Sequence, residues 1–81
     1  MDTARRLGWY PIKIHGNAYQ LSGLPDVLAL KGGVAVWLEV KRHGESTTRI
    51  QEHRMRELEE AGCIAAVVRS PAEAAAVLGG C

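Results

Sequence analysis

The chain is a series of short apolar runs separated by glycine, proline and polar residues that mark turns and helix ends. Two of these runs, residues 24–31 and 34–41, flank Gly32 and Gly33. A glycine pair suits the positive backbone dihedral angles of a two-residue turn. The pattern therefore predicts a hairpin of two antiparallel strands.

The segment before the hairpin predicts one further strand. Residues 9–15 favour a strand with Pro11 near its start, where a missing hydrogen-bond donor is tolerated. A short helical piece over residues 1–7 precedes this strand, and residues 16–23 have the composition of a loop.

A helix is predicted directly after the hairpin. Thr48 and Gln51 fit a capping box at its start, and the helix should run to about Ala61 and end at Gly62. The residues expected to form its apolar stripe are Ile50, Met55, Leu58 and Ala61.

The last part of the chain predicts a strand and a second helix. Residues 63–69 form a continuous apolar run, typical of a strand covered on both faces. Ser70 is suited to cap a helix over residues 71–78, with Pro71 at its first position. The predicted order is (α)βββαβα, which indicates one α/β domain over residues 1–81, with a mixed sheet flanked by helices.

Composition narrows the class of protein. The 81 residues are 47% hydrophobic and 23% charged, which is ordinary for a globular domain and argues against disorder. No apolar run approaches the roughly 20 residues needed to span a bilayer, and the first six residues lead into no apolar signal segment. The net charge of +1 does not by itself indicate nucleic-acid binding.

The cysteines and the short length suggest a compartment and an oligomeric state. Cys63 lies in an apolar run and Cys81 is the last residue, so we expect two free thiols in a reducing compartment. A domain of this size buries only about 60% of its unfolded surface, so a homodimer is expected.

The hairpin brings acidic residues together. If Gly32 and Gly33 form the turn, counting outward places Asp26 directly opposite Glu39. Opposed residues share a face, with Cβ atoms about 4.5–5.5 Å apart. Lys41 points to the same face as Glu39, whereas Val36, Leu38 and Val40 should point into the core.

Two carboxylates beside one ammonium group suggest a metal site. Hard oxygen ligands favour Mg²⁺ or Mn²⁺ over Zn²⁺, and a water acidified by the metal could attack a phosphodiester. An ordinary solvated charge network is the alternative. Against it, Asp26 lies where a loop enters the sheet, and Glu39 lies within an apolar run.

These residues resemble a known family. Gly23-Leu24-Pro25-Asp26, then Glu39-Val40-Lys41, then Gln51 on the next helix resemble the G-x-P-D, E-x-K and helical Gln of the PD-(D/E)xK nuclease superfamily. The likeness is to its VRR-NUC (virus-type replication-repair nuclease) branch and covers about residues 9–70. It implies a restriction-endonuclease-like core.

The resemblance also implies roles for particular residues. Asp26, Glu39 and the backbone carbonyl of Val40 would hold Mg²⁺ or Mn²⁺, Lys41 would be the catalytic lysine, and Gln51 would reach the site from the helix. Many relatives carry a further Glu on an N-terminal helix. Asp2 is the only acid before Gly8 and lies too near it to match, so either the chain continues upstream of Met1 or this member works without that acid.

Several basic and aromatic residues have two interpretations. The phosphate contacts that we favour are Lys13, Arg42, His43 and Arg49, with Arg54 and Arg56 as further candidates. The alternative is a mixed, solvated helix face for the arginines and a surface position for the histidine. Trp9 and Trp37 could stack on bases but are expected to pack in the core or at a dimer interface.

The family likeness leads to a functional hypothesis with two rivals. The lead is a Mg²⁺- or Mn²⁺-dependent DNA endonuclease selective for branched DNA such as Holliday junctions. It would act as a homodimer in DNA repair, in the cytoplasm of a bacterium or a phage-infected cell. The rivals are a non-catalytic DNA-binding module that keeps the nuclease fold, and a small structural or interaction domain.

Overall fold

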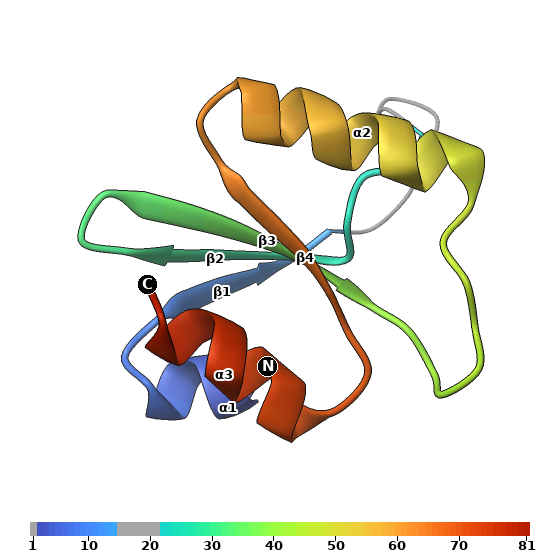
Figure 1. Cartoon of the computed structure of the whole chain (residues 1–81). Helices are drawn as coiled ribbons and strands as arrows, with labels where there is room; N and C mark the ends of the chain where they lie inside the picture. Colours follow the sequence, from blue (N-terminus) through green and yellow to red (C-terminus); the bar gives the residue numbers. More distant parts are fainter. Residues whose placement is uncertain (1, 15–21) are drawn as a thin grey trace.

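The computed structural model describes residues 2–14 and 22–81, and its elements follow the predicted order. Figure 1 shows them along the chain. They are α1 (Asp2–Arg6), β1 (Tyr10–Lys13), β2 (Val27–Lys31), β3 (Val34–Val40), α2 (Arg49–Glu60), β4 (Ile64–Val68) and α3 (Pro71–Gly79). None of the helices described is long and apolar enough to cross a membrane.

The sheet is mixed, as predicted. Its order is β1-β2-β3-β4, with antiparallel pairing from β1 to β3 and parallel pairing between β3 and β4. The parallel pair requires a crossover, which α2 supplies. Helix α2 lies on one face of the sheet, and α1 and α3 lie together on the other (Figure 1).

The hairpin forms in the predicted register. Gly32 and Gly33 both have positive φ, 56° and 81°, and Lys31 pairs with Val34 across them. The pairing continues to Val27 and Leu38. One residue further along each side of the hairpin come Asp26 and Glu39, so this register places the two acids opposite each other at the open end of the hairpin.

The core lies between the sheet and the pair α1 and α3. Its fully or nearly fully buried side chains are Ala4, Trp9, Val27, Ala29, Val36, Leu38, Val68 and Leu78. Trp9 is therefore a core residue, as expected. Burial of these apolar side chains is the main driving force available to so small a domain.

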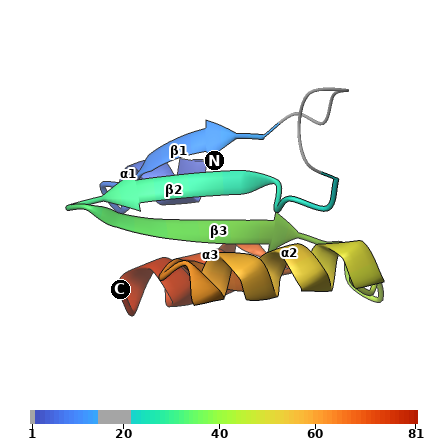
Figure 2. The ribbon, with the colours of Figure 1, turned by 90° about the horizontal axis from the view of Figure 1, so that it is seen from above.

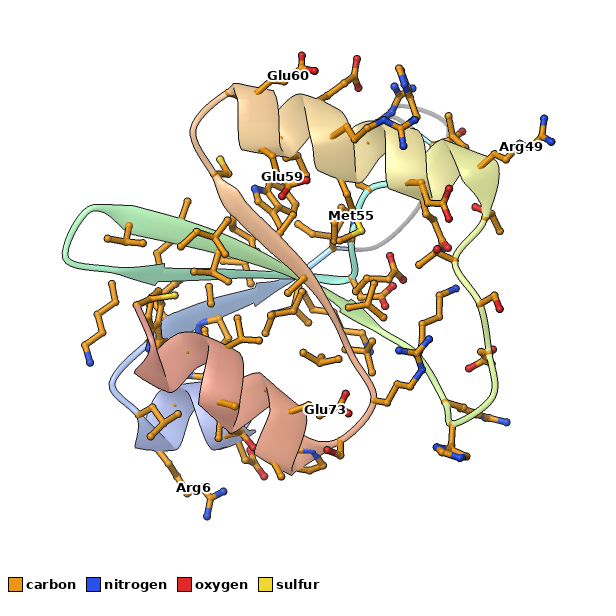
Figure 3. All side chains as sticks on the ribbon, in the orientation of Figure 1. Arg6, Arg49, Met55, Glu59, Glu60 and Glu73 are labelled. Atoms are coloured by element: carbon orange, nitrogen blue, oxygen red, sulfur yellow. The ribbon has the colours of Figure 1, made fainter. Side chains whose placement is uncertain are left out.

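The opposite face is only partly covered. Figure 2 shows α2 running along the β3 side of the sheet, away from β1. Met55 points from α2 towards the sheet (Figure 3), and it and Leu58 are half-buried. Ile50 and Ala61 are exposed, so the predicted stripe is wrong at both ends. Ile50 lies in the first turn, where α2 packs on the segment at Gly23 and not on the sheet, and Ala61 is the C-cap that follows the last helical residue.

Three local expectations need correction. The second strand begins at Val27 and not at residue 24, because Pro25 cannot donate to a sheet ladder. Strand β4 lies at the sheet edge, and only Val68 in it is buried. Val40 is 54% exposed and not a core residue, because it ends β3 beyond the area that α1 and α3 fill. The predicted loop falls largely on residues 15–21, outside the described part.

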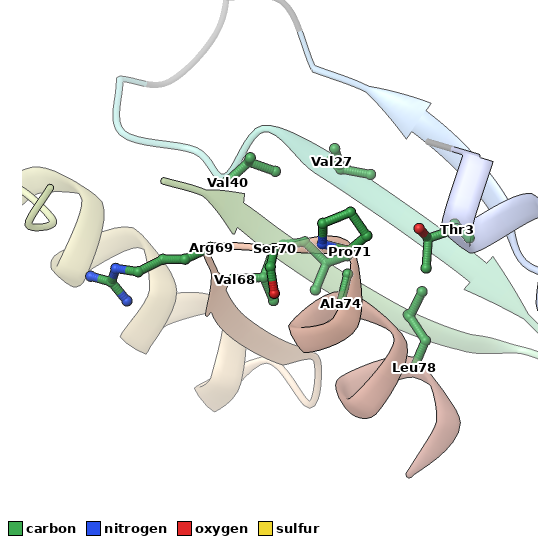
Figure 4. Close-up of a pocket in the computed structure, with 11 residues that line it drawn as sticks. Thr3, Val27, Val40, Val68, Arg69, Ser70, Pro71, Ala74 and Leu78 are labelled. Atoms are coloured by element: carbon green, nitrogen blue, oxygen red, sulfur yellow. The ribbon is translucent and has the colours of Figure 1, made fainter. Parts of the chain in front are cut away.

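The uncovered end of the core leaves a cavity. It has a volume of about 230 Å³ and lies between the sheet and α3 (Figure 4). Val27, Val40 and Val68 line its sheet side, and Pro71 and Ala74 line its helix side.

Cys63 is half-buried and Cys81 exposed, and both are free thiols.

Candidate metal centre

Asp26 lies at the open end of the hairpin, opposite the turn, and is held there by hydrogen bonds at the ends of β1 and β3. Its backbone carbonyl accepts a hydrogen bond from the Ile14 N–H at 2.7 Å, which ties it to the end of β1. Its carboxylate oxygen Oδ2 accepts a hydrogen bond from the Val40 N–H at 2.9 Å. The side chain of Asp26 is thus directed across the hairpin, towards the strand that carries Glu39.

Glu39 is a buried acid with an incomplete set of partners. Its side chain is 2% exposed, and among the described residues its Oε2 has no hydrogen-bond partner. The pKa of Glu39 is raised from its ordinary 4.5 to about 7. Burial is the largest cause, a hydrogen bond with Asp26 and the negative charge of Asp26 also contribute, and the charge of Lys41 opposes the rise. The two acids therefore converge beside the lysine.

Lys41 is positioned by the sheet immediately after β3 ends. Its backbone N–H donates to the Val68 carbonyl at 3.0 Å, which extends the parallel pairing of β3 and β4 by one residue. The side chain is half-buried, and its charge acts on Glu39. An ammonium group in this position can stabilise negative charge that develops on a phosphate.

Gln51 belongs to the capping box of α2. Its Oε1 accepts a hydrogen bond from the Thr48 N–H at 2.9 Å, and its own N–H donates to Thr48 Oγ1 at 3.2 Å. The capping interpretation is therefore confirmed. Since its amide oxygen is engaged in the cap, the role of Gln51 at a metal stays a prediction.

The segment before Asp26 packs closely on the start of α2. Gly23 has φ +82°, and a Cβ built on it would lie 2.8 Å from the carbonyl carbon and oxygen of Ile50. Pro25 is fully buried. Only glycine allows this approach, because any side chain would collide with the helix backbone. The G-x-P-D sequence thus fixes the loop against the helix.

Replacing Gly23 by alanine is expected to lower the free energy of unfolding by about 3 kcal/mol, because backbone strain adds to the collision with Ile50. Gly44→Ala is the matched control. Gly44 has φ +88° but open space around its Cβ position, so about 1 kcal/mol is expected. Urea unfolding of both variants gives the difference, and equal losses would contradict the close packing at Gly23.

The other predicted residues are basic and lie at the protein surface. Lys13 lines a surface cavity of about 360 Å³ together with Asp26, Val27 and Val40. Arg42, His43 and Arg49 are exposed, and Arg49 points away from the start of α2 (Figure 3). Their contacts with DNA stay predictions.

One structural comparison identifies the fold. A solved structure titled "VRR_NUC domain protein" superimposes with a TM-score of 0.69 at 20% sequence identity, over 86% of this chain. The chain has the VRR-NUC fold. It spans 64% of the length of that protein. No family model matches the sequence, and no curated protein does. The predicted fold class, a mixed sheet with flanking helices of the nuclease type, is confirmed.

Within the VRR-NUC fold, the donors fit a hard cation. In residues 2–14 and 22–81 no group of three or more His, Cys, Asp or Glu side chains gathers as a metal site. The candidate donors are therefore the carboxylates of Asp26 and Glu39 and the Val40 carbonyl. The buried Glu39 Oε2, which has no hydrogen-bond partner among the described residues, is an acceptor of the kind that a cation would satisfy. Mg²⁺ needs few protein ligands because it retains water, so this set suits it or Mn²⁺.

The sequence did not reveal two side chains that hold the segments next to the site. Arg69 Nη2 donates to the Glu45 carbonyl at 2.8 Å and so fastens the segment after Lys41 to the end of β4. Arg54 Nε donates to the Ser22 carbonyl and so holds the segment before Asp26. Neither contact could be predicted from the sequence, because each arginine bonds to a backbone carbonyl far away along the chain.

Proposed function

We propose that this chain is a Mg²⁺- or Mn²⁺-dependent endonuclease domain that hydrolyses phosphodiester bonds in DNA. The observation that carries the proposal is the convergence of Asp26 and the buried Glu39 beside Lys41. Two carboxylates that repel each other, one of them buried, cost stability, and a cation would offset that cost. The VRR-NUC fold adds independent support.

Each residue of the site has a distinct part in the proposed reaction. A divalent ion held by Asp26, Glu39 and the Val40 carbonyl would neutralise phosphate charge and acidify a water. The Val40 N–H holds the Asp26 carboxylate, so this metal ligand is already oriented before the ion binds. Lys41 would orient the attacking water or stabilise the charge that builds up on the phosphate oxygens. Lys13 and Arg42, with His43 and Arg49, would contact the flanking phosphates.

The proposed substrate is branched DNA, cut by a homodimer. A symmetric junction presents two equivalent strands, which suits a dimer with two sites. The exposed Tyr10, Ile12 and Leu30 give apolar surface that a second copy could cover. The free thiols support a reducing cytoplasm, bacterial or phage-infected, and junction cleavage would place the protein in DNA repair.

Cleavage of a four-way junction with Mn²⁺, Mg²⁺ or EDTA tests the function. We expect strand scission with either metal and none with EDTA, while a linear duplex is cut more slowly. Sedimentation of the same preparation should give twice the mass of the chain. Scission that persists in EDTA would contradict the metal dependence.

A non-catalytic DNA-binding module is the second candidate. It is favoured by one observation: in the described part of the chain, no third acidic side chain joins Asp26 and Glu39. This candidate predicts junction binding without scission at any Mn²⁺ concentration, and the same assay separates the two.

A further inference from the structure

Arg54 differs from the other arginines of α2 in where its side chain goes. Arg49 and Arg56 are exposed, whereas the Arg54 side chain is only 17% exposed. Its Nε donates a hydrogen bond to the Ser22 carbonyl at 2.9 Å, 32 residues away in the sequence. Arg54 is therefore turned towards the segment that leads to Asp26 and not outward, as a phosphate contact would be.

A neighbouring acid fixes the orientation of the guanidinium group. Arg54 Nη1 pairs with Glu57 Oε1 at 2.8 Å, one turn along the helix. The planar group can serve both partners at once, because its donors have a fixed geometry. Glu57 thus holds the guanidinium while Nε remains directed at Ser22.

The Ser22 contact lies at one end of a short, tightly packed segment. Gly23 follows and touches the backbone of Ile50, Pro25 is fully buried, and Asp26 comes next. The segment is not part of the sheet until Val27. Asp26 itself is hydrogen-bonded to Ile14 and Val40. Packing against α2 adds to these contacts by fixing the residues that lead to Asp26: Arg54 provides a hydrogen bond and Gly23 provides the close approach.

We propose that Arg54 is a positioning residue for the metal centre: by holding the Ser22 carbonyl it acts together with the Ile14 and Val40 contacts to set where Asp26 lies relative to Glu39. The inference rests on the proposed function for its consequence at the metal, but the positioning itself is a property of the free protein. Residues that orient metal ligands from behind commonly change metal affinity by about 10- to 100-fold when replaced.

Two substitutions separate the hydrogen bond from the charge. Arg54→Met keeps a long side chain but removes every donor. Arg54→Gln loses the charge but keeps an N–H donor at the same number of bonds from the backbone as Nε. Arg56→Met is the matched control, since it removes an exposed arginine from the same helix.

The first measurement needs no metal or DNA. The Val40 amide is protected by Asp26 Oδ2, so its hydrogen exchange reports the position of that carboxylate. We expect exchange at Val40 to be about tenfold faster in Arg54→Met, with Arg54→Gln and Arg56→Met close to wild type. The amides of Val36 and Leu38 should not change by the same factor. Unchanged exchange at Val40 in Arg54→Met, or a uniform rise along β3, would overturn the proposal.

The second measurement is a titration of the protein with Mn²⁺ alone. The electron paramagnetic resonance signal of the unbound Mn²⁺ reports how much of the ion is bound. Arg54→Met should weaken Mn²⁺ binding by about tenfold, and Arg54→Gln should restore most of it. If Gln binds as poorly as Met, the charge and not the hydrogen bond is responsible, and the positioning role is wrong. If the wild type binds no Mn²⁺, the proposed function fails, while exchange at Val40 still decides the role of Arg54.

Discussion

Asp26→Asn is expected to reduce Mn²⁺-dependent junction cleavage by at least about 100-fold, with the fold retained. Asparagine has the shape of aspartate and keeps a side-chain oxygen that can accept from the Val40 N–H. The change therefore removes the negative charge and leaves the contact that holds the loop. Loss of a charged metal ligand or of electrostatic stabilisation typically costs roughly two to three orders of magnitude in rate.

Lys41→Met should lower the cleavage rate by a similar factor while Mn²⁺ still binds, since the lysine is proposed to act on the substrate. Glu60→Gln is the control, because Glu60 is an exposed acid at the far end of α2 (Figure 3). Single-turnover rates and circular dichroism of all proteins give the comparison. Wild-type rates in Asp26→Asn and Lys41→Met would refute the assigned roles.

In the absence of metal, the protein is expected to lose stability as the pH rises from about 5 to 8. The pKa of Glu39 is about 7 in the folded chain and near 4.5 when unfolded. Between these values the folded state binds more protons than the unfolded state, so raising the pH favours unfolding. The loss is on the order of 3 kcal/mol once the pH is above 7.

Glu39→Gln should remove most of this dependence, because the amide is neutral at every pH. Urea unfolding in EDTA at pH 5 and pH 8 measures it. At pH 8 the variant should be the more stable protein, and at pH 5 the two should be similar. In Glu60→Gln the free energy of unfolding should fall with rising pH as it does in the wild type. Parallel slopes for wild type and Glu39→Gln would show that Glu39 titrates normally.

Contacts between residues close in the sequence are the part of the fold that could be predicted. The Gly32-Gly33 turn, the capping box of Thr48 and Gln51, and the Ser70 cap all formed as expected. The turn in particular fixed the register, and with it the convergence of Asp26 and Glu39. For that reason the pairing of the two acids follows from the positions of residues within one hairpin.

Burial was predicted less well, because it depends on elements far apart in the chain. Val40 was expected in the core and is exposed, since α1 and α3 do not extend over the end of β3. Strand β4 was expected to be covered on both faces and is largely half-buried at the sheet edge. An apolar run has the same pattern in either situation.

The sequence alone determined the order of elements, the hairpin register and the identity of the paired acids. It did so because turns, caps and strand alternation depend on neighbours within a few residues. Only the tertiary structure decided how deeply Glu39 is buried, and hence its raised pKa, and which arginine holds the segment before Asp26. Both depend on where α2 lies on the sheet, which is set by the packing of the whole domain.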